Sequence, residues 1–555
     1  MHTPLVLIIR DGWGIRDESD GNAVKLARTP VIDGLLATFP RSRLKAAGTA
    51  VGVRDGIQGS SEVGHLNMGA GRIVEQEIVR VDKVIASPGF YANPKLCAAL
   101  RYCQARSSRL HLMGLVQDQG VHATEDHLFA LLDFCAHHRF DRVFIHFFAD
   151  GRDTPPQSAP TYLDRLEKKL SELGVGRVAS VIGRYYAMDR DRRWERTKRA
   201  YDALVHGIGF RAASAREAIE AAYRRRLSDS VPVAPDARAP AVETDEFIQP
   251  TLIVGADGAP IATIAAGDAV IHFNYRQDRA IQLTKAFVED RLEEEGFSRG
   301  PRAPVYYLGM TRYYDEFADF IIPPMNMANL LGEVFASRGL WQLRLSESQK
   351  FRHVTSFFNG KRLAPFPRED RIQVRSLGVR EDEAPEMRAP AVTAFAETAV
   401  TAAVGATRAL AARTDDVTVE FDPAVPGERE RYAVIIMNYA NPDMVGHTGS
   451  LPAAIRAVEV VDDCVGRVVT ATHRVGGCVL VTSDHGNVEQ MIDPVTRAPQ
   501  TAHTANDVDF ILACPAMRGR ALRPAGILAD VAPTMLDLLG IPIPAEMTAA
   551  SLINP

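Results

Sequence analysis

The sequence predicts an α/β protein of at least two domains, one of which is assembled from both ends of the chain and interrupted by the other. Its 555 residues exceed what one ordinary hydrophobic core organises. Short apolar runs alternate with longer helical patterns, which indicates a largely parallel sheet covered by helices. Apolar runs near both termini lead to acidic residues, so we expect the two ends of the chain to fold together.

The composition is that of a globular protein, with 46% hydrophobic and 24% charged residues. A formal net charge of -5 gives no general attraction to nucleic acid or to anionic membranes. No stretch offers the roughly 20 consecutive apolar residues of a transmembrane helix, and the apolar run at 5–9 is too short for a signal peptide. We therefore expect a cytoplasmic protein without nucleic-acid or membrane partners.

The six cysteines are scattered and form no C-x-x-C pair. This spacing argues against a cysteine-ligated zinc site and against a disulfide framework. Because unpaired cysteine usually behaves as a small buried hydrophobe, we expect reduced and mostly buried thiols. The residues are Cys97, Cys103, Cys135, Cys464, Cys478 and Cys514.

Three apolar runs lead to an acidic residue. The run at 5–9 leads to Asp11, the run at 432–437 leads to Asp443, and the run at 478–482 leads to Asp484. Open α/β sheets bind ligands just beyond the carboxyl ends of their strands. We therefore expect the three acids to converge on one crevice, in a domain that contains both residue 11 and the residues beyond 440.

The middle of the chain supplies the insert. Residues from about 79 to 309 contain strand-like runs of their own, enough for a second α/β domain. These runs lie at 110–116, 143–148, 178–182 and 269–273. Charge, Pro and Gly concentrate in further segments that we expect to be surface excursions. The segments are 228–245, 290–304, 361–390 and 414–431.

The acids and histidines at the strand ends form two candidate sets of metal ligands. Asp443 and His447 are four residues apart, a spacing that brings both to one side of a helical turn, and His503 is a third candidate. The other set is Asp11, Asp484 and His485. Mixed carboxylate and imidazole ligation suits Mn²⁺ or Zn²⁺ at a hydrolytic or transfer site. One such histidine alone is more often a structural residue, and it is the joint pattern that favours metal binding.

A serine pair between small residues offers a nucleophile. Ser60 and Ser61 lie in Gly-Ser-Ser-Glu-Val-Gly-His, residues 59–65. A serine hydroxyl is weak near neutral pH unless a base or a metal activates it, and the ligand sets could supply that metal. The pairing predicts attack on a phosphorylated or sulfated substrate. The spacing does not choose between the two serines, and Ser-Ser-Glu-Val is also typical of a helix N-cap.

Arginines recur after the strand-like runs of the insert. Guanidinium groups at strand ends are suited to bidentate binding of carboxylate or phosphate, so we expect an anion pocket. A single arginine is more often a solvated surface residue, and only the recurrence favours a site. The candidates are Arg152, Arg184, Arg190, Arg276 and Arg279, with Asp153 and His122 as further polar groups.

Long motifs of the chain closely resemble those of the cofactor-independent phosphoglycerate mutase family of the alkaline phosphatase superfamily. The likeness extends over nearly the whole chain. The motifs are Asp11-Gly-Trp-Gly14, Ser61-Glu-Val-Gly-His-Leu-Asn67, His122, Asp150-Gly-Arg-Asp-Thr-Pro-Pro156, Arg184-Tyr-Tyr-Ala-Met-Asp-Arg190, Arg276, Arg279, Lys350 with His353-Val-Thr355, Asn438-Tyr-Ala-Asn-Pro-Asp-Met-Val-Gly-His-Thr-Gly449, Asp484-His-Gly-Asn487 and His503-Thr504.

The resemblance implies an alkaline-phosphatase-like three-layer domain with a second α/β domain inserted through two hinges. The metal-binding phosphatase-like domain would comprise 1–76 and 312–555, and the substrate-binding transferase domain 77–311. The resemblance makes Ser61 the phosphorylated nucleophile and implies two divalent ions, with Mn²⁺ expected. One ion would be held by Asp443, His447 and His503, and the other by Asp11, Ser61, Asp484 and His485. Substrate contacts would come from His122, Arg152, Asp153, Arg184, Arg190, Arg276, Arg279 and Lys350.

The implied reaction is the interconversion of 3-phosphoglycerate and 2-phosphoglycerate through a phosphoserine, a step of glycolysis and gluconeogenesis. Catalytic roles would fall to Ser61, to Lys350 as a charge stabiliser and to Asp153 as a proton acceptor. A monomer is expected. The chain departs from the family pattern at Ser60, where Asn is usual, at Lys361, where a second Gly is common, and in segments 372–383 and 414–431.

Two other functions fit part of the pattern. A phosphomonoesterase, or another transferase of the superfamily such as a phosphopentomutase, would use the same metal ligands. The arginines and Asp153 of the insert favour the mutase, since a plain phosphatase has no need to hold a small acid. An inactive metal-binding scaffold is the third possibility, but no proposed ligand is missing from the sequence.

Overall fold

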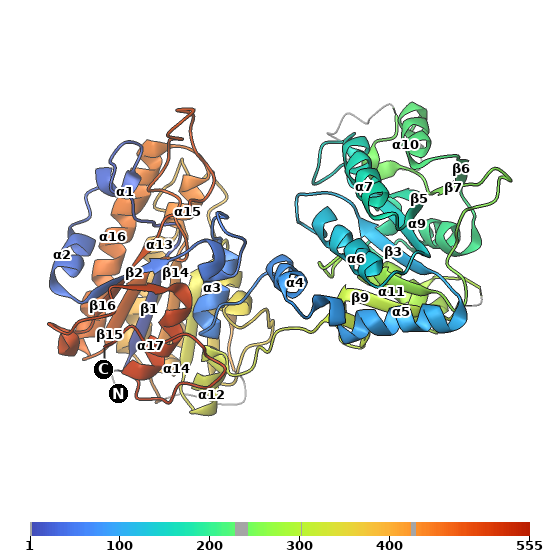
Figure 1. Ribbon diagram of the computed structural model, residues 1–555. Coiled ribbons are helices and arrows are strands. Elements are labelled where there is room, and N and C mark those ends of the chain that lie inside the picture. The colour runs from blue at the N-terminus through green and yellow to red at the C-terminus, as the bar shows by residue number, and fades with distance from the viewer. Residues whose placement is uncertain (1–2, 228–241, 301, 423–428, 555) are drawn as a thin grey trace. The chain divides into compact units, whose positions relative to one another are not determined.

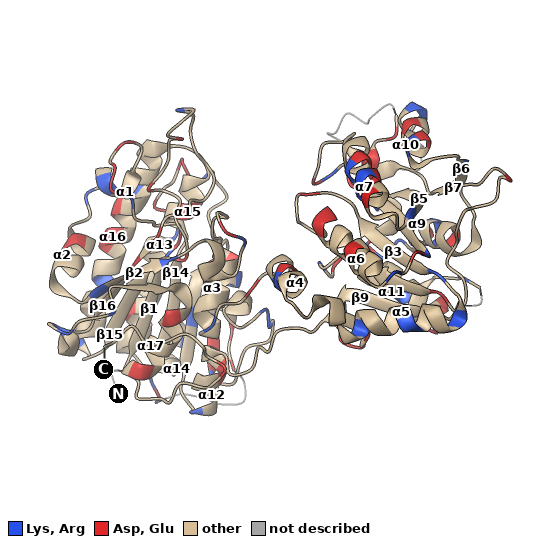
Figure 2. Ribbon diagram, viewed as in Figure 1, with Lys and Arg blue, Asp and Glu red and all other residues tan. Residues whose placement is uncertain are grey.

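The computed structural model describes residues 3–227, 242–300, 302–422 and 429–554. The chain divides into two compact units, the first made of Met1–Gln76 with Met325–Pro555 and the second of Glu77–Pro324 (Figure 1). Each unit contains its own multistranded sheet with helices, so the predicted α/β fold class is confirmed. Among the described helices, none combines the length and apolarity that crossing a bilayer requires. Acidic and basic residues are interspersed on both units (Figure 2).

The first unit is built on a nine-stranded sheet in the order β13-β12-β11-β14-β1-β15-β16-β2-β17. The three strands predicted to lead to acids are β14, β1 and β15, which are neighbours and mutually parallel. The strands are β1 Leu5–Arg10, β2 Arg41–Lys45, β11 Gln342–Glu347, β12 Glu369–Val374, β13 Val417–Glu420, β14 Val434–Tyr439, β15 Cys478–Thr482, β16 Val508–Ala513 and β17 Ala525–Ile527.

Helices cover both faces of this sheet. Because successive side chains of a strand point to opposite faces, β1 contributes Leu5, Leu7 and Ile9 to one core and Val6 and Ile8 to the other. The first core contains α3 (Ser61–Ala70), α12 (Leu331–Ser337) and α17 (Val531–Leu538). The second contains α2 (Pro30–Thr38), α13 (Ala389–Thr401), α14 (Val404–Ala411) and α16 (Leu451–Arg474). The unit is therefore a three-layer sandwich. Its short elements are α1 Ala23–Leu26, α15 Asn441–Gly446, η1 Gly48–Val51, η6 His353–Phe357, η7 Pro515–Met517 and η8 Leu528–Asp530.

The second unit is built on an eight-stranded sheet in the order β10-β9-β8-β3-β4-β5-β7-β6. The four strand-like runs of the insert form its centre, β8-β3-β4-β5, and pair in parallel. The strands are β3 Leu110–Leu115, β4 Val143–Ala149, β5 Arg177–Gly183, β6 Phe210–Ala212, β7 Thr251–Ile253, β8 Ala269–His272, β9 Tyr306–Thr311 and β10 Phe320–Ile322. The helices are α4 Glu77–Ala86, α5 Pro94–Arg106, α6 Glu125–His137, α7 Ala159–Leu173, α8 Arg184–Ala187, α9 Trp194–Tyr201, α10 Ala215–Arg224 and α11 Ile281–Val288, with η2 Phe90–Ala92, η3 Asp202–His206, η4 Asp245–Phe247 and η5 Glu293–Glu295.

The second boundary between the units differs from the one expected from sequence. The sequence placed it after residue 311, whereas the structure places it between Pro324 and Met325. The reason is strand β10, which pairs in parallel with β9 and adds an edge to the sheet of the second unit. Three residues are too short a run to be recognised as a strand from periodicity.

One expected surface excursion is wrong. Segment 361–390 contains β12, a largely buried strand that pairs in parallel with β11. Its first residues are charged, which is why the sequence indicated a loop. The charges are buried because they are paired: Asp370 contacts Arg408, and Glu369 contacts Arg371 at 2.7 Å. Of the other expected excursions, 228–241 and 423–428 lie outside the described residues.

The expectation of reduced thiols is wrong for one pair. A disulfide joins Cys478, at the start of β15, to Cys514, just beyond β16. Strands β15 and β16 are antiparallel with Val479 opposite Ala513, so the two cysteines face each other across the ladder, with Cα atoms 4.5 Å apart. Cys97, Cys103, Cys135 and Cys464 are free, and three of them are buried.

The core of the second unit contains buried histidines. His272 on β8 is fully buried, with Nδ1 3.2 Å from the Tyr307 hydroxyl and Nε2 without a hydrogen-bond partner. Burial lowers the pKa of His272 to about 3. The ring is therefore neutral in the folded protein at neutral pH, whereas in the unfolded chain it would titrate near the ordinary value of about 6.5.

We expect the free energy of unfolding to fall at acidic pH because folded His272 stays neutral. Below pH ~6.5 the unfolded chain gains a proton that folded His272 does not take up, so stability present above that pH is lost as the pH falls. At pH 5 the loss from this one group should be about 2 kcal/mol. We expect His272→Gln to reduce the difference in free energy of urea unfolding between pH 7.5 and pH 5 by about that amount. Substituting the exposed His137 is the control, and an unchanged difference in His272→Gln would contradict this account.

Candidate active site

Three acids meet at one edge of the first sheet. Asp11 follows β1, Asp443 lies in α15 just after β14, and Asp484 follows β15. Because these strands are adjacent and parallel, their carboxyl ends lie together. All three side chains are at most 1% exposed.

Asp11, Asp484 and His485 form a fully buried cluster whose potential ligand atoms lie within 4.8 Å of one another. Ser61 adjoins it. The Ser61 hydroxyl is 3.0 Å from Nε2 of His485 and 3.1 Å from Oδ1 of Asp11. One carboxylate oxygen of Asp484, Oδ2, is buried and has no hydrogen-bond partner. A buried carboxylate oxygen without a donor fits coordination to a cation.

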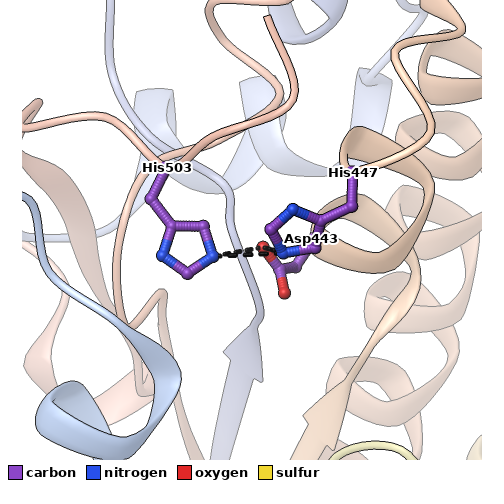
Figure 3. Close-up of side chains that lie close together, drawn as sticks. All are labelled: Asp443, His447 and His503. Carbon is purple, nitrogen blue, oxygen red and sulfur yellow. Dashed lines mark hydrogen bonds and ion pairs between the residues drawn. The ribbon is translucent and has the colours of Figure 1, made fainter. Parts of the chain in front are cut away.

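Asp443, His447 and His503 form a second cluster (Figure 3). Nε2 of His447 is 3.3 Å and Nε2 of His503 is 3.2 Å from Oδ1 of Asp443. The two imidazole nitrogens are 3.2 Å apart. The rings approach the carboxylate from different segments of the chain, with His447 at the end of α15 and His503 in the loop before β16.

Backbone carbonyls orient the histidines. Nδ1 of His447 donates to the Thr501 carbonyl at 2.7 Å, and Nδ1 of His503 donates to the Gly59 carbonyl at 3.0 Å. Nδ1 of His485 is 3.2 Å from the Gly486 carbonyl. Since a carbonyl can only accept, each ring carries its proton on Nδ1 and turns an unprotonated Nε2 towards the acids when the ring is neutral. This is the arrangement of metal-binding histidines.

Lys350 places a positive charge among the acids. Its ammonium is 2.7 Å from both Oδ1 of Asp11 and the Ser61 hydroxyl, and it also contacts Asp443. Burial alone would lower the pKa of Lys350, but Asp11 and Asp443 raise it. Burial alone would raise the pKa of Asp11 and of Asp443, and Lys350 lowers both. One ammonium does not neutralise three carboxylates. The nitrogen and oxygen atoms present are suited to bind a divalent metal ion, which would supply further positive charge.

The two serines of the pair have different surroundings. Ser60 is the N-cap of α3, and its hydroxyl accepts a hydrogen bond from the Val63 amide at 3.4 Å. Ser61 is the first residue of the helix, is 5% exposed and contacts the acid and imidazole cluster. Ser60 thus caps the helix, whereas the Ser61 hydroxyl contacts Asp11 and His485. A helix N-terminus in this position also favours a bound anion.

Several polar residues at the site had no role in the sequence-based prediction. Nδ1 of His65 donates to the Ser61 carbonyl at 2.9 Å and lies 3.2 Å from Oδ2 of Asp484 without a hydrogen bond to it. The Asn438 amide donates to Oδ2 of Asp11 at 2.7 Å. The Asn487 amide donates to Asp443 at 2.8 Å. All three residues are fully buried and lie within or beside the motifs that supply the acids. Their types and positions were visible in the sequence, but only the fold shows which acid each one contacts.

The second unit gathers the predicted arginines at the edge of its own sheet. Arg184 is 2% exposed and donates at 2.6 Å to Asp150 and to Asp153. Nη2 of Arg184 lies 3.0 Å from Nε2 of His122. These residues follow β3, β4 and β5, which are adjacent parallel strands, so their clustering has the same topological origin as that of the acids in the first unit.

Further guanidinium groups adjoin this cluster. Arg190 and Arg276 both pair with Asp278, at 2.6 Å and 3.1 Å, and Arg152 pairs with Glu246 at 3.5 Å. These three arginine side chains are 44% to 55% exposed, so they are accessible to a ligand. Arg279 donates to the Met188 carbonyl. Asp278 was not among the predicted residues.

His122 is neutral in this environment. Burial and, secondarily, the nearby Arg184 lower the pKa of His122 to about 4. Its Nε2 faces Arg184, so the proton of the neutral ring is on Nδ1, a buried atom without a hydrogen-bond partner. The ring therefore offers one donor beside several guanidinium groups, a combination suited to an oxygen-rich anion.

Comparison with known proteins gives matches over both units. A family model described as "BPG-independent PGAM N-terminus" matches residues 81–315, within the second unit, and one described as "Metalloenzyme superfamily" matches residues 395–543, within the first. The 2,3-bisphosphoglycerate-independent phosphoglycerate mutase of Moorella thermoacetica is 47% identical, over 100% of this chain and 99% of that protein. The corresponding protein of Pseudomonas fluorescens is 44% identical, over 99% of each.

A solved structure gives the same result. The phosphoglycerate mutase of Leishmania mexicana, crystallised at low cobalt concentration, aligns with a TM-score of 0.60 and 32% identity, over 100% of this chain and 98% of that one. Together with the two acid and imidazole clusters, the superfamily match defines a metalloenzyme that uses divalent metal ions. The full-length identities go further. The chain belongs to the 2,3-bisphosphoglycerate-independent phosphoglycerate mutase family, as the sequence motifs predicted.

Helix α3 packs closely against the loop that contains Asp484, and this packing can be tested by substitution. A Cβ on Gly64 would lie 2.8 Å from Cβ of Asp484, closer than side chains tolerate. We expect Gly64→Ala to lower the free energy of unfolding by about 1 to 3 kcal/mol, because the loop must move. Gly34, in α2, has nothing within 4 Å of a Cβ, so Gly34→Ala should stabilise by about 0.5 to 1 kcal/mol. Urea unfolding measures both, and equal stability of the two variants would contradict the packing argument.

Proposed function

We propose that this chain interconverts 3-phosphoglycerate and 2-phosphoglycerate through a phosphoserine at Ser61, without a bisphosphoglycerate primer. The observation that supports this most directly is the position of the Ser61 hydroxyl, which lies within 3.1 Å of Lys350, His485 and Asp11. A hydroxyl beside an ammonium, an imidazole and a carboxylate at a helix N-terminus is arranged for attack on a phosphate ester.

We propose two Mn²⁺ ions as the resident metals. Asp443, His447 and His503 would hold one, and Asp11, Ser61, Asp484 and His485 would hold the other. When bound, such ions lower the pKa of a serine hydroxyl and neutralise phosphoryl oxygens. The donor set of carboxylate oxygens and imidazole nitrogens, with no thiolate, suits Mn²⁺.

In the first half-reaction, deprotonated Ser61 attacks the substrate phosphorus. The bond between phosphorus and the glycerate oxygen breaks, and the leaving oxygen takes up one proton, which is balanced by the proton that the other glycerate hydroxyl releases in the second half-reaction. Lys350, whose pKa is raised by its acidic neighbours despite burial, stays charged and stabilises the negative charge that develops on the phosphoryl oxygens. In the second half-reaction, the other glycerate hydroxyl attacks phosphoserine 61 and the steps run in reverse.

The second unit would supply substrate recognition. A mutase differs from a phosphatase in that it retains the glycerate while the phosphoryl group is on the serine. We assign carboxylate and hydroxyl binding to His122, Arg152, Asp153, Arg184, Arg190, Arg276 and Arg279. Asp153 would accept the proton of the attacking hydroxyl, and its side chain is 21% exposed, which leaves the carboxylate accessible. The expectations of a monomer and of a cytoplasmic location stay predictions.

The serine pair offers a matched test of the reaction. With 3-phosphoglycerate and no primer, we expect formation of 2-phosphoglycerate in an assay coupled to enolase. Ser61→Ala should lower the rate by about 10⁴-fold or more, since the nucleophile is removed. Ser60→Ala should stay within about tenfold of wild type and lose about 1 kcal/mol of stability, because only the helix cap is affected. Release of free phosphate without 2-phosphoglycerate would refute the mutase and indicate a phosphatase.

Metal removal tests the cofactor. Treatment with a chelator should abolish activity, and Mn²⁺ should restore it in wild type but not in Ser61→Ala. Mn²⁺ affinity should also fall as the pH drops, because the histidines bind as neutral imidazoles and protons compete with the ion. Among these ligands, hydrogen bonding to Asp443 raises the pKa of His447. Activity that survives exhaustive chelation, or affinity that is flat from pH 8 to pH 5, would count against the assignment.

A further inference from the structure

Glu489 is a fully buried carboxylate to which no role has been assigned so far. Its Oε2 accepts hydrogen bonds from the backbone amides of Gly14 at 3.0 Å and Asn487 at 2.8 Å. Its Oε1 accepts from the Asn506 side-chain amide at 2.9 Å and from the Thr504 hydroxyl. In the described part of the chain, no Lys, Arg or His pairs with it. Its two oxygens are therefore held by neutral hydrogen-bond donors.

The four donors come from the loops that carry the proposed metal ligands. Gly14 lies three residues after Asp11 in the loop that follows β1. Asn487 lies two residues after His485. Thr504 and Asn506 lie one and three residues after His503. One side chain thus joins three loops, and its bond to Gly14 spans 475 residues of sequence.

The loops approach this carboxylate as closely as backbone can. A Cβ built on Gly14 or on Gly486 would overlap the carboxyl group of Glu489. Backbone hydrogen bonds also join these loops. The Val488 amide donates to the Gly12 carbonyl at 3.1 Å, and the Thr504 amide donates to the Gly486 carbonyl at 3.0 Å. The hydrogen bonds to Glu489 add to these backbone contacts and tie all three loops to one buried side chain.

We propose that Glu489 is a positioning residue that sets the divalent-ion affinity of both clusters. It touches no proposed ligand side chain. It acts through the backbone that holds Asp11, His485 and His503. The inference rests on the proposed metal binding but not on the mutase reaction. Loss of outer-shell partners of this kind typically weakens metal binding by about 10- to 100-fold.

Glu489→Gln tests this role. Glutamine has nearly the size of glutamate, but its NH₂ group would face N–H or O–H groups that now donate to the carboxylate. Metal-free protein is titrated with Mn²⁺ by calorimetry, without substrate, well below its melting temperature. We expect the dissociation constant for Mn²⁺ to rise about 10- to 100-fold. Asn506→Ala removes a single donor and should give a smaller rise, of about three- to tenfold. If Glu489→Gln does not fold, Asn506→Ala and Thr504→Val provide the same comparison.

Asp370→Asn is the matched control for destabilisation alone. Asp370 is equally buried in the same unit, but it lies near the start of β12, away from the ligand loops. It binds Arg408 of α14 and Tyr432, which lies just before β14. We expect it to lower the melting temperature of the metal-free protein and to leave the Mn²⁺ dissociation constant within threefold of wild type.

The outcomes separate the two proposals. Wild-type affinity in folded Glu489→Gln, or an equal loss of affinity in Asp370→Asn, would overturn the positioning role. Absence of Mn²⁺ binding by wild type would overturn it as well. A wild-type protein that binds Mn²⁺ but forms no 2-phosphoglycerate would refute the proposed reaction, while a selective loss of binding in Glu489→Gln would still establish the role of Glu489.

Discussion

The first unit depends on holding three carboxylates together in the absence of bulk water. Asp11, Asp443 and Asp484 are at most 1% exposed, and an isolated buried carboxylate would be strongly disfavoured. Lys350 offsets part of this charge. Donors such as Asn438 and Asn487 satisfy further lone pairs. The remaining demand for positive charge suits this edge of the sheet to the divalent ions that we propose.

The topology of the sheet makes the cluster possible. Strands β14, β1 and β15 are parallel neighbours, so acids placed just after each strand meet without long excursions of the chain. Close backbone approach then brings the loops into contact. Gly12 packs against Asp443, and Gly64 packs against Asp484, in both cases with no space for a side chain. Small residues at these positions are therefore part of the site, although they carry no functional group.

The second unit uses the same topology for the opposite charge. Guanidinium groups follow its strands β8, β4 and β5, and His122 follows β3. The acids among the guanidinium groups pair with them and hold them in place. The two units divide the chemistry required of a phosphoglycerate mutase. One concentrates acids and imidazoles around the Ser61 hydroxyl, and the other concentrates cations suited to a small carboxylic acid. The hydrogen bonds of Glu489 support the acid and imidazole clusters indirectly, because they hold the loops that carry the proposed ligands and do not contact the ligand side chains.

Much of this was predictable because chemistry constrains residue type at strand ends. The runs before Asp11, Asp443 and Asp484 are apolar and of strand length, so periodicity and the strand-end rule predicted both the parallel sheet and the meeting of the acids. The sequence motifs also predicted the family to which the chain belongs. Spacing alone could not choose between Ser60 and Ser61. The exact residue at which α3 begins decides which hydroxyl caps the helix and which one faces the cluster.

The sequence by itself determined the α/β class, the insertion of one domain into another, the family and the set of polar residues at the strand ends. These follow from local patterns and from motifs that can be read in order. Only the tertiary structure decided that charged β12 is buried, that β10 belongs to the second unit, that Cys478 faces Cys514, and that Glu489 joins three loops. Each of these depends on a partner distant in sequence. Burial of a charge or pairing of an edge strand becomes favourable only when the fold has brought that partner into contact.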